Sequence, residues 1–157
     1  MTADYLNIYN NLIKLTRNKN LYVNLNRNDE FSDRLIFLMF HFALFLKNYK
    51  SQLSKKKSQE LFDFFIRQIE LSIREIGYGD VSVNKKMKEY VNLFYSILDK
   101  IETQNFEEKE NLNIFFKNLL NIDKNMNFYA DYYQKYDQYL SNNTLNHFTK
   151  DILNHNF

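Results

Sequence analysis

The residues that interrupt helices are nearly absent from this chain. Its 157 residues include no proline, and its two glycines, Gly77 and Gly79, lie in one short stretch. Proline removes a backbone hydrogen-bond donor and glycine weakens a helix, so chains rich in loops and sheets usually contain several of each. This chain is therefore expected to be all-α. Its length suits one domain with a hydrophobic core, and we predict a single helical domain over residues 1–157.

The spacing of the apolar residues supports a helical bundle. In five segments they recur at steps of three and four, which places them on one face of a helix. These segments cover residues 5–15, 62–76, 87–101, 112–122 and 129–140. Together with the apolar stretch described next, they predict about six helices, and the C-terminal segment could add a short one. The alternation typical of a strand occurs only in the sequence LYVNLN.

One stretch is apolar without interruption on any face. From Leu35 to Leu46, all twelve side chains are apolar or aromatic except that of His41. Twelve helical residues span about 18 Å, whereas the hydrocarbon core of a bilayer is about 30 Å thick. The stretch is too short for a straight transmembrane helix, and a helix that is apolar all round needs covering on several sides. We predict a central buried helix and no transmembrane segment.

His41 has two interpretations. A single histidine in an apolar helix is more often a core residue with a hydrogen-bonded ring than a residue that contacts a ligand or partner. The other histidines, His147 and His155, lie far along the chain, and cysteine is absent. Because a metal site needs several convergent ligands, we predict no metal at His41.

The segments between the predicted helices contain residues that can cap them. Asn28 or Ser32 is expected to cap the apolar helix. A lysine-rich turn at residues 47–57 precedes a helix that should begin near Ser58. Asn105 is expected to cap the helix that begins in the sequence EEKENL, whose glutamates suit the positive end of a helix dipole.

Both glycines lie in the sequence REIGYGDVSVNKKMK. Gly77 is expected to end the preceding helix in the left-handed conformation, and Asp80 or Ser82 to cap the next helix. The two long helices should then form an antiparallel hairpin. Gly79 is not needed for capping, so it is a candidate for close approach by the backbone of a partner.

Three lysines, Lys85, Lys86 and Lys88, follow this turn. Such lysines are most often simply solvated, and the alternative is a cationic rim for an acidic peptide or for lipid headgroups. The net charge of +2 over the whole chain is too small to argue for nucleic-acid binding. No catalytic triad, paired-carboxylate motif, phosphate loop or dinucleotide motif is visible, so we predict a protein that is not an enzyme and has no cofactor.

The order of these features resembles the ubiquinol–cytochrome c chaperone family, in particular its alphaproteobacterial members. The family pattern has an apolar helix with a central histidine, a helix that ends in a Gly-x-Gly-Asp turn, and a basic helix with a Phe-Tyr pair. The matching residues are His41; Gly77, Gly79 and Asp80; Lys85, Lys86 and Lys88; and Phe94 and Tyr95. The resemblance covers about residues 20–100. The alanine and arginine common in the family are replaced here by Asn, Lys, Phe and Tyr, as AT-rich codon usage would do, so tyrosine-rich stretches are given little functional weight.

The resemblance implies a non-catalytic assembly chaperone of the cytochrome bc1 complex that binds newly made cytochrome b. The membrane surface and the ribosome are further candidate partners. Because no secretory signal is visible in MTADYLNIYN, the protein is expected in the cytoplasm, with peripheral association with the inner membrane. The residues expected to contact the partner are His41, Gly77, Gly79, Asp80, Lys85, Lys86, Lys88 and Tyr95.

Two other classes of protein remain open at the level of sequence. A helical regulator that binds nucleic acid or a soluble protein would gather residues 47–57 and 85–88 on one continuous surface. An apolar groove that opens beside such lysines would instead favour the chaperone. An enzyme would need a polar pocket, which the sequence does not indicate.

Overall fold

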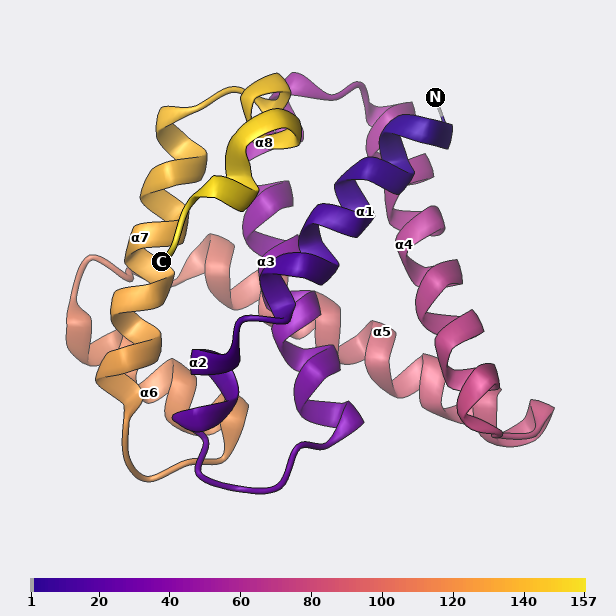
Figure 1. The fold of residues 1–157 in the computed structure, drawn as a ribbon, viewed down its shortest axis with the longest axis horizontal. Coiled ribbons are helices and arrows are strands. Elements are labelled where there is room, and N and C mark those ends of the chain that lie inside the picture. The colour runs from indigo at the N-terminus through magenta and orange to yellow at the C-terminus, as the bar shows by residue number, and fades with distance from the viewer. Residues whose placement is uncertain (1) are drawn as a thin grey trace.

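The structure is a computed structural model that describes residues 2–157, and this range contains helices and no strand (Figure 1). The eight α-helices are α1 (Thr2–Thr16), α2 (Lys19–Val23), α3 (Phe31–Tyr49), α4 (Lys55–Ile76), α5 (Asp80–Thr103), α6 (Lys109–Leu120), α7 (Met126–Asn142) and α8 (Leu145–Asp151). Short 3₁₀ turns follow α3 at Lys50–Gln52 and α8 at Ile152–Asn154. The all-α prediction is confirmed.

The helix count exceeds the predicted six because two short helices were not among the predicted segments. One is α8, which corresponds to the optional C-terminal helix. The other is α2, which occupies the first part of LYVNLN, so the strand signal there was wrong. The alternation arises because Leu21 and Leu25 are buried while Val23 is largely exposed. A turn and a half of helix satisfies that pattern as well as a strand does.

Several helix boundaries differ from the predicted ones. Helix α3 follows Glu30 without a side-chain cap, and α4 begins at Lys55, capped by Ser54. The acidic residue Asp33 lies in the first turn of α3 and pairs with Arg27 at 2.5 Å. A carboxylate there favours the positive end of the helix dipole, so α3 can begin without Asn28 or Ser32 as its cap.

The predicted cap of α6 was also wrong. The side chain of Asn105 accepts a hydrogen bond from the backbone N–H of Glu107 at 3.0 Å, which closes a turn before the helix. Helix α6 itself begins at Lys109 after Glu108, whose side chain forms no capping bond. Asparagine competes for local backbone donors in this way and therefore stabilises turns as readily as helix starts.

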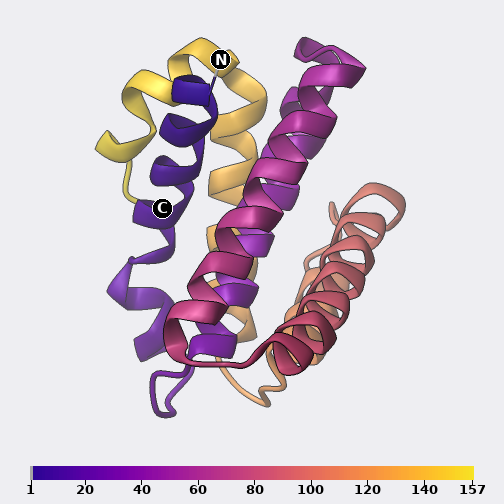
Figure 2. The same cartoon turned by 90° about the vertical axis from the view of Figure 1, so that its right-hand side faces the viewer.

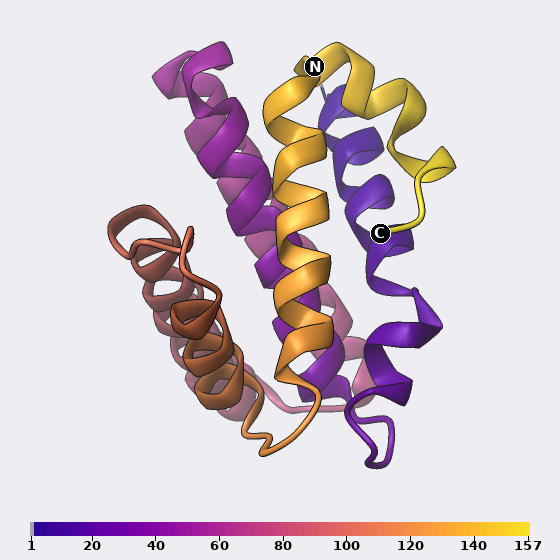
Figure 3. The same cartoon turned by 90° about the vertical axis from the view of Figure 1, so that its left-hand side faces the viewer.

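Helix α3 lies between the other helices, with α1, α5 and α7 packed against it (Figures 1 and 3). All residues from 37 to 46 are buried, including Leu44 and Phe45, whose side chains are fully inaccessible. Covering on several sides is what the unbroken apolar sequence requires. The prediction of a central buried helix is therefore confirmed for most of the stretch, with Ile36 only partly buried.

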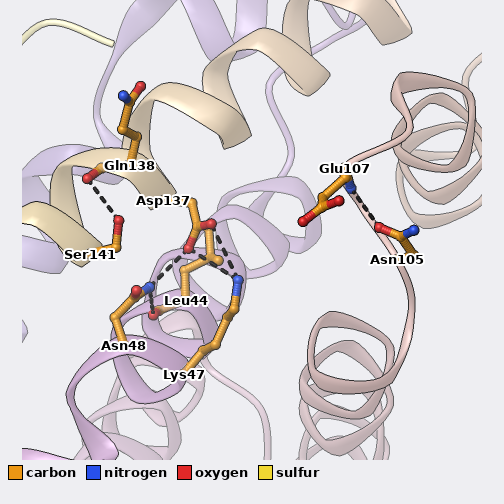
Figure 4. A network of polar contacts seen from close by, with 8 residues as sticks. All are labelled: Leu44, Lys47, Asn48, Asn105, Glu107, Asp137, Gln138 and Ser141. Atoms are coloured by element: carbon orange, nitrogen blue, oxygen red, sulfur yellow. Dashed lines mark hydrogen bonds and ion pairs between the residues drawn. The ribbon is translucent and has the colours of Figure 1, made fainter.

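Polar contacts also hold α7 against α3. Asp137 of α7 accepts hydrogen bonds from Lys47 at 3.2 Å and from Asn48 at 2.9 Å (Figure 4). Deeper in the same interface, the hydroxyl of Tyr136 donates to the backbone carbonyl of His41 at 3.0 Å. The hydroxyl of Tyr129, also on α7, donates to the carbonyl of Leu21 of α2 at 2.6 Å. These tyrosines bury large rings while satisfying their hydroxyl groups.

Helices α4 and α5 leave their common turn in different directions and do not lie against each other along their length (Figures 1 and 2). The predicted antiparallel hairpin is therefore wrong in its geometry. The reason is that α5 packs chiefly on α3. Aromatic side chains fill the space that opens between the helices: Phe42 of α3 stacks on Phe65 with ring centroids 4.0 Å apart, and Phe62 stacks on Tyr95 at 5.6 Å.

Candidate partner-binding surface

His41 is fully buried at the interface of α3 and α7. Its Nδ1 lies 2.7 Å from the carbonyl oxygen of Phe37, which can only accept, so Nδ1 carries the proton and donates. The other nitrogen, Nε2, lies 2.6 Å from the hydroxyl of Tyr132 and accepts from it. Both ring nitrogens are therefore engaged within the chain. The interpretation of His41 as a hydrogen-bonded core residue fits this geometry, and its side chain has no access to a partner at the surface.

Burial also keeps His41 neutral. Loss of solvation lowers the pKa of its ring from 6.5 to about 4, and the hydrogen bond to Phe37 opposes this shift only in part. In the unfolded chain the ring takes up a proton as the pH falls below 6.5, whereas in the folded chain it does so only near pH 4. The free energy of unfolding should therefore fall as the pH decreases from 6.5 to 4.

We expect the lowered pKa of His41 to reduce the free energy of unfolding by about 2.5 kcal/mol when the pH falls from 7 to 4.5. The measurement is urea unfolding at both values for the wild type and for His41→Gln, which lacks the titrating ring. Subtracting the two pH dependences removes the contribution of the carboxylates. An equal loss of stability in both proteins would show that His41 titrates normally in the folded state.

The turn between α4 and α5 places the two glycines in different conformations. Gly77 ends α4 with φ +108°, the left-handed conformation, as predicted. Gly79 has φ −74° and ψ 166°, which any residue can adopt, and no atom lies within 4 Å of the position of a Cβ there. Neither the backbone nor the packing of the chain requires a glycine at residue 79.

Asp80 is not a helix cap, and neither is Ser82, because α5 begins at Asp80 and its N-cap residue is Gly79. The carboxylate of Asp80 instead pairs with Arg74 of α4 at 2.5 Å. Arg74 also pairs with Glu70, and hydrogen bonds to both carboxylates raise the pKa of its guanidinium. This exposed pair links the two helices across the turn.

Exposed apolar side chains surround the turn. Val81 is 86% exposed, and Ile76 and Tyr78 are also exposed. The ammonium group of Lys86 lies 5.1 Å from the ring centroid of Tyr78, a cation–π arrangement, while Lys85 and Lys88 are exposed. We call residues 76–81 together with these three lysines the tip. Within residues 2–157, none of the three lysines has an ion-pair partner.

A second feature, which we call the cleft, lies farther along the same two helices. It is a depression of about 200 Å³ formed by the end of α3, the first half of α4 and the second half of α5. Its apolar lining consists of Leu46, Phe62, Phe94, Tyr95 and Leu98. Lys50, Lys55 and Glu102 contribute charges.

The face of α5 connects the tip to the cleft. Lys88, Val91 and Tyr95 recur at steps of three and four, which places them on one side of the helix. Tyr95 is 53% exposed although its ring stacks on Phe62. The structure thus brings Gly77, Gly79, Asp80, Lys85, Lys86, Lys88 and Tyr95 onto one helix pair. His41 stands apart from them in the core.

The two lysine-rich segments do not form one surface. Residues 55–57 begin α4 and residues 85–88 follow its far end, and a helix of 22 residues is about 33 Å long. The lysines at the start of α4 instead border the apolar cleft. A regulator that binds nucleic acid would need the two lysine segments on one continuous surface, whereas an apolar groove beside lysines is expected of the chaperone. The observed arrangement therefore favours the chaperone.

Two elements of this region could not be predicted from the sequence. The cleft depends on the divergence of α4 and α5, which follows from the packing of α5 on α3. The hydroxyl of Tyr132 that fixes His41 lies 91 residues away in the chain. The tyrosine periodicity of residues 129–140 could have indicated Tyr132, but it was discounted as a consequence of composition.

None of the helices in residues 2–157 combines the length and apolar character needed to cross a membrane. In the same range, no three histidine, cysteine or acidic side chains converge as metal ligands would.

The structure is that of an all-helical protein with exposed apolar and basic side chains on one helix pair. The family model described as "Ubiquinol-cytochrome C chaperone" matches residues 23–120, which is well over half of the chain and includes α3 to α6. The chain therefore belongs to the ubiquinol–cytochrome c chaperone family. No curated protein and no solved structure matches it. Membership supports a chaperone role in assembly of the cytochrome bc1 complex.

Proposed function

We propose that this protein is a non-catalytic chaperone that binds newly made cytochrome b and holds it during assembly of the cytochrome bc1 complex. The observation that carries the proposal is the family match, because the matched residues 23–120 contain both the tip and the cleft. The binding surface that we propose consists of these two features and the face of α5 between them.

The chemistry of this surface suits an unfinished membrane subunit. Before its cofactors and partner subunits are in place, such a protein exposes apolar helix faces and polar cavities that invite misassembly. The aromatic floor of the cleft, Phe62 and Phe94, can accept an apolar helix, as in other helix-in-groove complexes. The lysines at the tip can pair with carboxylates or with lipid headgroups near the membrane surface.

Gly79 has a role in this proposal that the folded chain does not explain. Because its backbone is unstrained and its surroundings are open, only a contact outside the chain would benefit from the missing side chain. A glycine lets another backbone approach closely, and the Asp80 carboxylate beside it can accept hydrogen bonds from that backbone.

Affinity purification from detergent-solubilised membranes tests the proposal. The tagged protein should retain cytochrome b when assembly is under way, and the amount should increase when later assembly steps are blocked. Recovery of ribosomes, nucleic acid or a soluble protein without cytochrome b would favour the helical regulator instead.

A further inference from the structure

A pocket that shares no residue with the cleft lies between α1, α2, α3 and α4. Its volume is about 480 Å³, which falls in the range of 300–1,000 Å³ typical of sites for small molecules. The lining is mainly apolar and comes from four elements of the chain. Its apolar lining residues include Tyr9, Ile13, Phe31, Leu35, Leu38 and Ile69.

Two cations border this pocket without partners in the described chain. Arg17 follows the last turn of α1 and Lys19 begins α2, and both are exposed and form no ion pair within residues 2–157. A third cation, Arg34, is already paired with Asp29 in a bidentate arrangement. The rim therefore carries two positive charges that are available to an anion.

The proposed cytochrome b surface does not account for this combination. The tip and the cleft share no residue with this pocket, which also uses Tyr9, Ile13 and Arg17, before the residues that match the family model. An apolar pocket with cations at its rim is complementary to a molecule with an apolar chain and one anionic end.

We propose that the pocket binds one long-chain carboxylate, a free fatty acid. The alkyl chain would lie along Ile13, Leu38 and Ile69, where it loses contact with water. The carboxylate would lie at the rim, where the guanidinium of Arg17 can donate two hydrogen bonds and Lys19 adds a second positive charge. The inference goes beyond the proposed function and does not depend on it.

Titration calorimetry and native mass spectrometry with hexadecanoate, below its micelle concentration, test this proposal on the full chain. We expect one bound molecule per protein. Each methylene moved from water to an apolar site adds roughly a factor of four in affinity. Tetradecanoate and dodecanoate should therefore bind progressively more weakly, by up to roughly fifteenfold per step. Hexadecanol, which lacks the charge, should bind about tenfold more weakly.

Two variants distinguish the contribution of the alkyl chain to binding from that of the carboxylate. Arg17→Gln/Lys19→Gln should weaken hexadecanoate about tenfold and leave hexadecanol unchanged. The matched control Lys117→Gln/Lys124→Gln removes the same charge from the exposed surface at α6 and the loop after it, and should change neither. Ile13→Trp fills the pocket and should abolish binding of both molecules, with circular dichroism and the thermal midpoint confirming that it is folded.

Several results would overturn the proposal. These are variable stoichiometry, affinity that does not depend on chain length, equal weakening by the control pair, or binding to anionic phospholipid vesicles with no uptake of monomeric hexadecanoate. Because every assay uses purified protein without cytochrome b, a negative result would leave the proposed chaperone function standing. A failure to find cytochrome b bound in cells would likewise not bear on the proposal that the pocket binds a fatty acid.

Discussion

Replacing Leu44 or Phe40 with alanine should lower the free energy of unfolding by about 2–5 kcal/mol, the loss typical of truncated core side chains. Leu44 is fully buried in α3. Phe40 packs edge-on against Phe116 with ring centroids 5.5 Å apart, and close to Tyr133 at 5.8 Å. Each truncation leaves a cavity where α3 meets its neighbours, and urea unfolding at pH 7 measures the cost.

The matched control is Leu71→Ala on α4, where the leucine is 45% exposed. This change should alter stability by less than about 0.5 kcal/mol, as surface substitutions usually do. A loss below half a kcal/mol for both core variants would contradict the central position of α3.

Reversing Lys85 and Lys86 to glutamate should lower the accumulation of cytochrome b in cells severalfold while the protein remains folded. Lys85 is exposed, and neither Lys85 nor Lys86 forms an ion pair among the described residues, so the fold does not depend on either charge. If these lysines meet acidic groups of the partner, reversal replaces attraction with repulsion. The readout is the absorbance of the cytochrome b haems in membranes.

Gly79→Leu provides a second and uncharged test of the same surface. Since φ at this residue is −74° and the surroundings are open, leucine should add no strain and cost about 1 kcal/mol as a poorer N-cap residue, so the protein stays folded while a close backbone approach is obstructed. Lys14→Glu/Lys150→Glu serves as the charge control, because both lysines are exposed on α1 and α8. Normal cytochrome b spectra with Lys85→Glu/Lys86→Glu and with Gly79→Leu would exclude the tip and leave the cleft as the candidate surface.

Association of the purified proteins should also weaken with added salt. Charges at the exposed tip are screened over about 8–10 Å at physiological ionic strength. The apolar contacts of the cleft depend little on salt, so the residual affinity at high salt estimates their share of the binding.

Local periodicity was enough to predict most of the helices, including the buried position of α3 and the end of α4 at Gly77. These features depend on side chains a few residues apart, which one stretch of sequence contains. Local failures were limited to helix caps and the short strand signal in LYVNLN, whereas the failure in tertiary arrangement concerns relations between distant segments. The divergence of α4 and α5 follows from Phe42 and Phe94 stacking at 5.4 Å between α3 and α5, a contact that neither segment indicates alone.

The sequence predicted most of the residues of the candidate surface but not how all of them are placed in the fold. The tip residues are neighbours in sequence, so the turn necessarily keeps them together. His41 was placed in the same group by resemblance, yet its hydrogen bonds to Phe37 and Tyr132 hold it inside the bundle. The helix at residues 129–140 was predicted, but its tyrosines were given little weight because of the composition, although Tyr129, Tyr132 and Tyr136 each make a specific hydrogen bond in the core.

Site-specific photocrosslinking tests most directly the claim that the α4–α5 surface binds cytochrome b. A photoreactive phenylalanine derivative would replace Tyr95 in the cleft or Val81 at the tip, both exposed, with the exposed Leu153 near the C-terminus as the control position. Irradiation of cells that are assembling the bc1 complex should link cytochrome b to residues 95 and 81 and not to residue 153. Crosslinks from residue 153 alone, or equal yields from all three positions, would contradict the account.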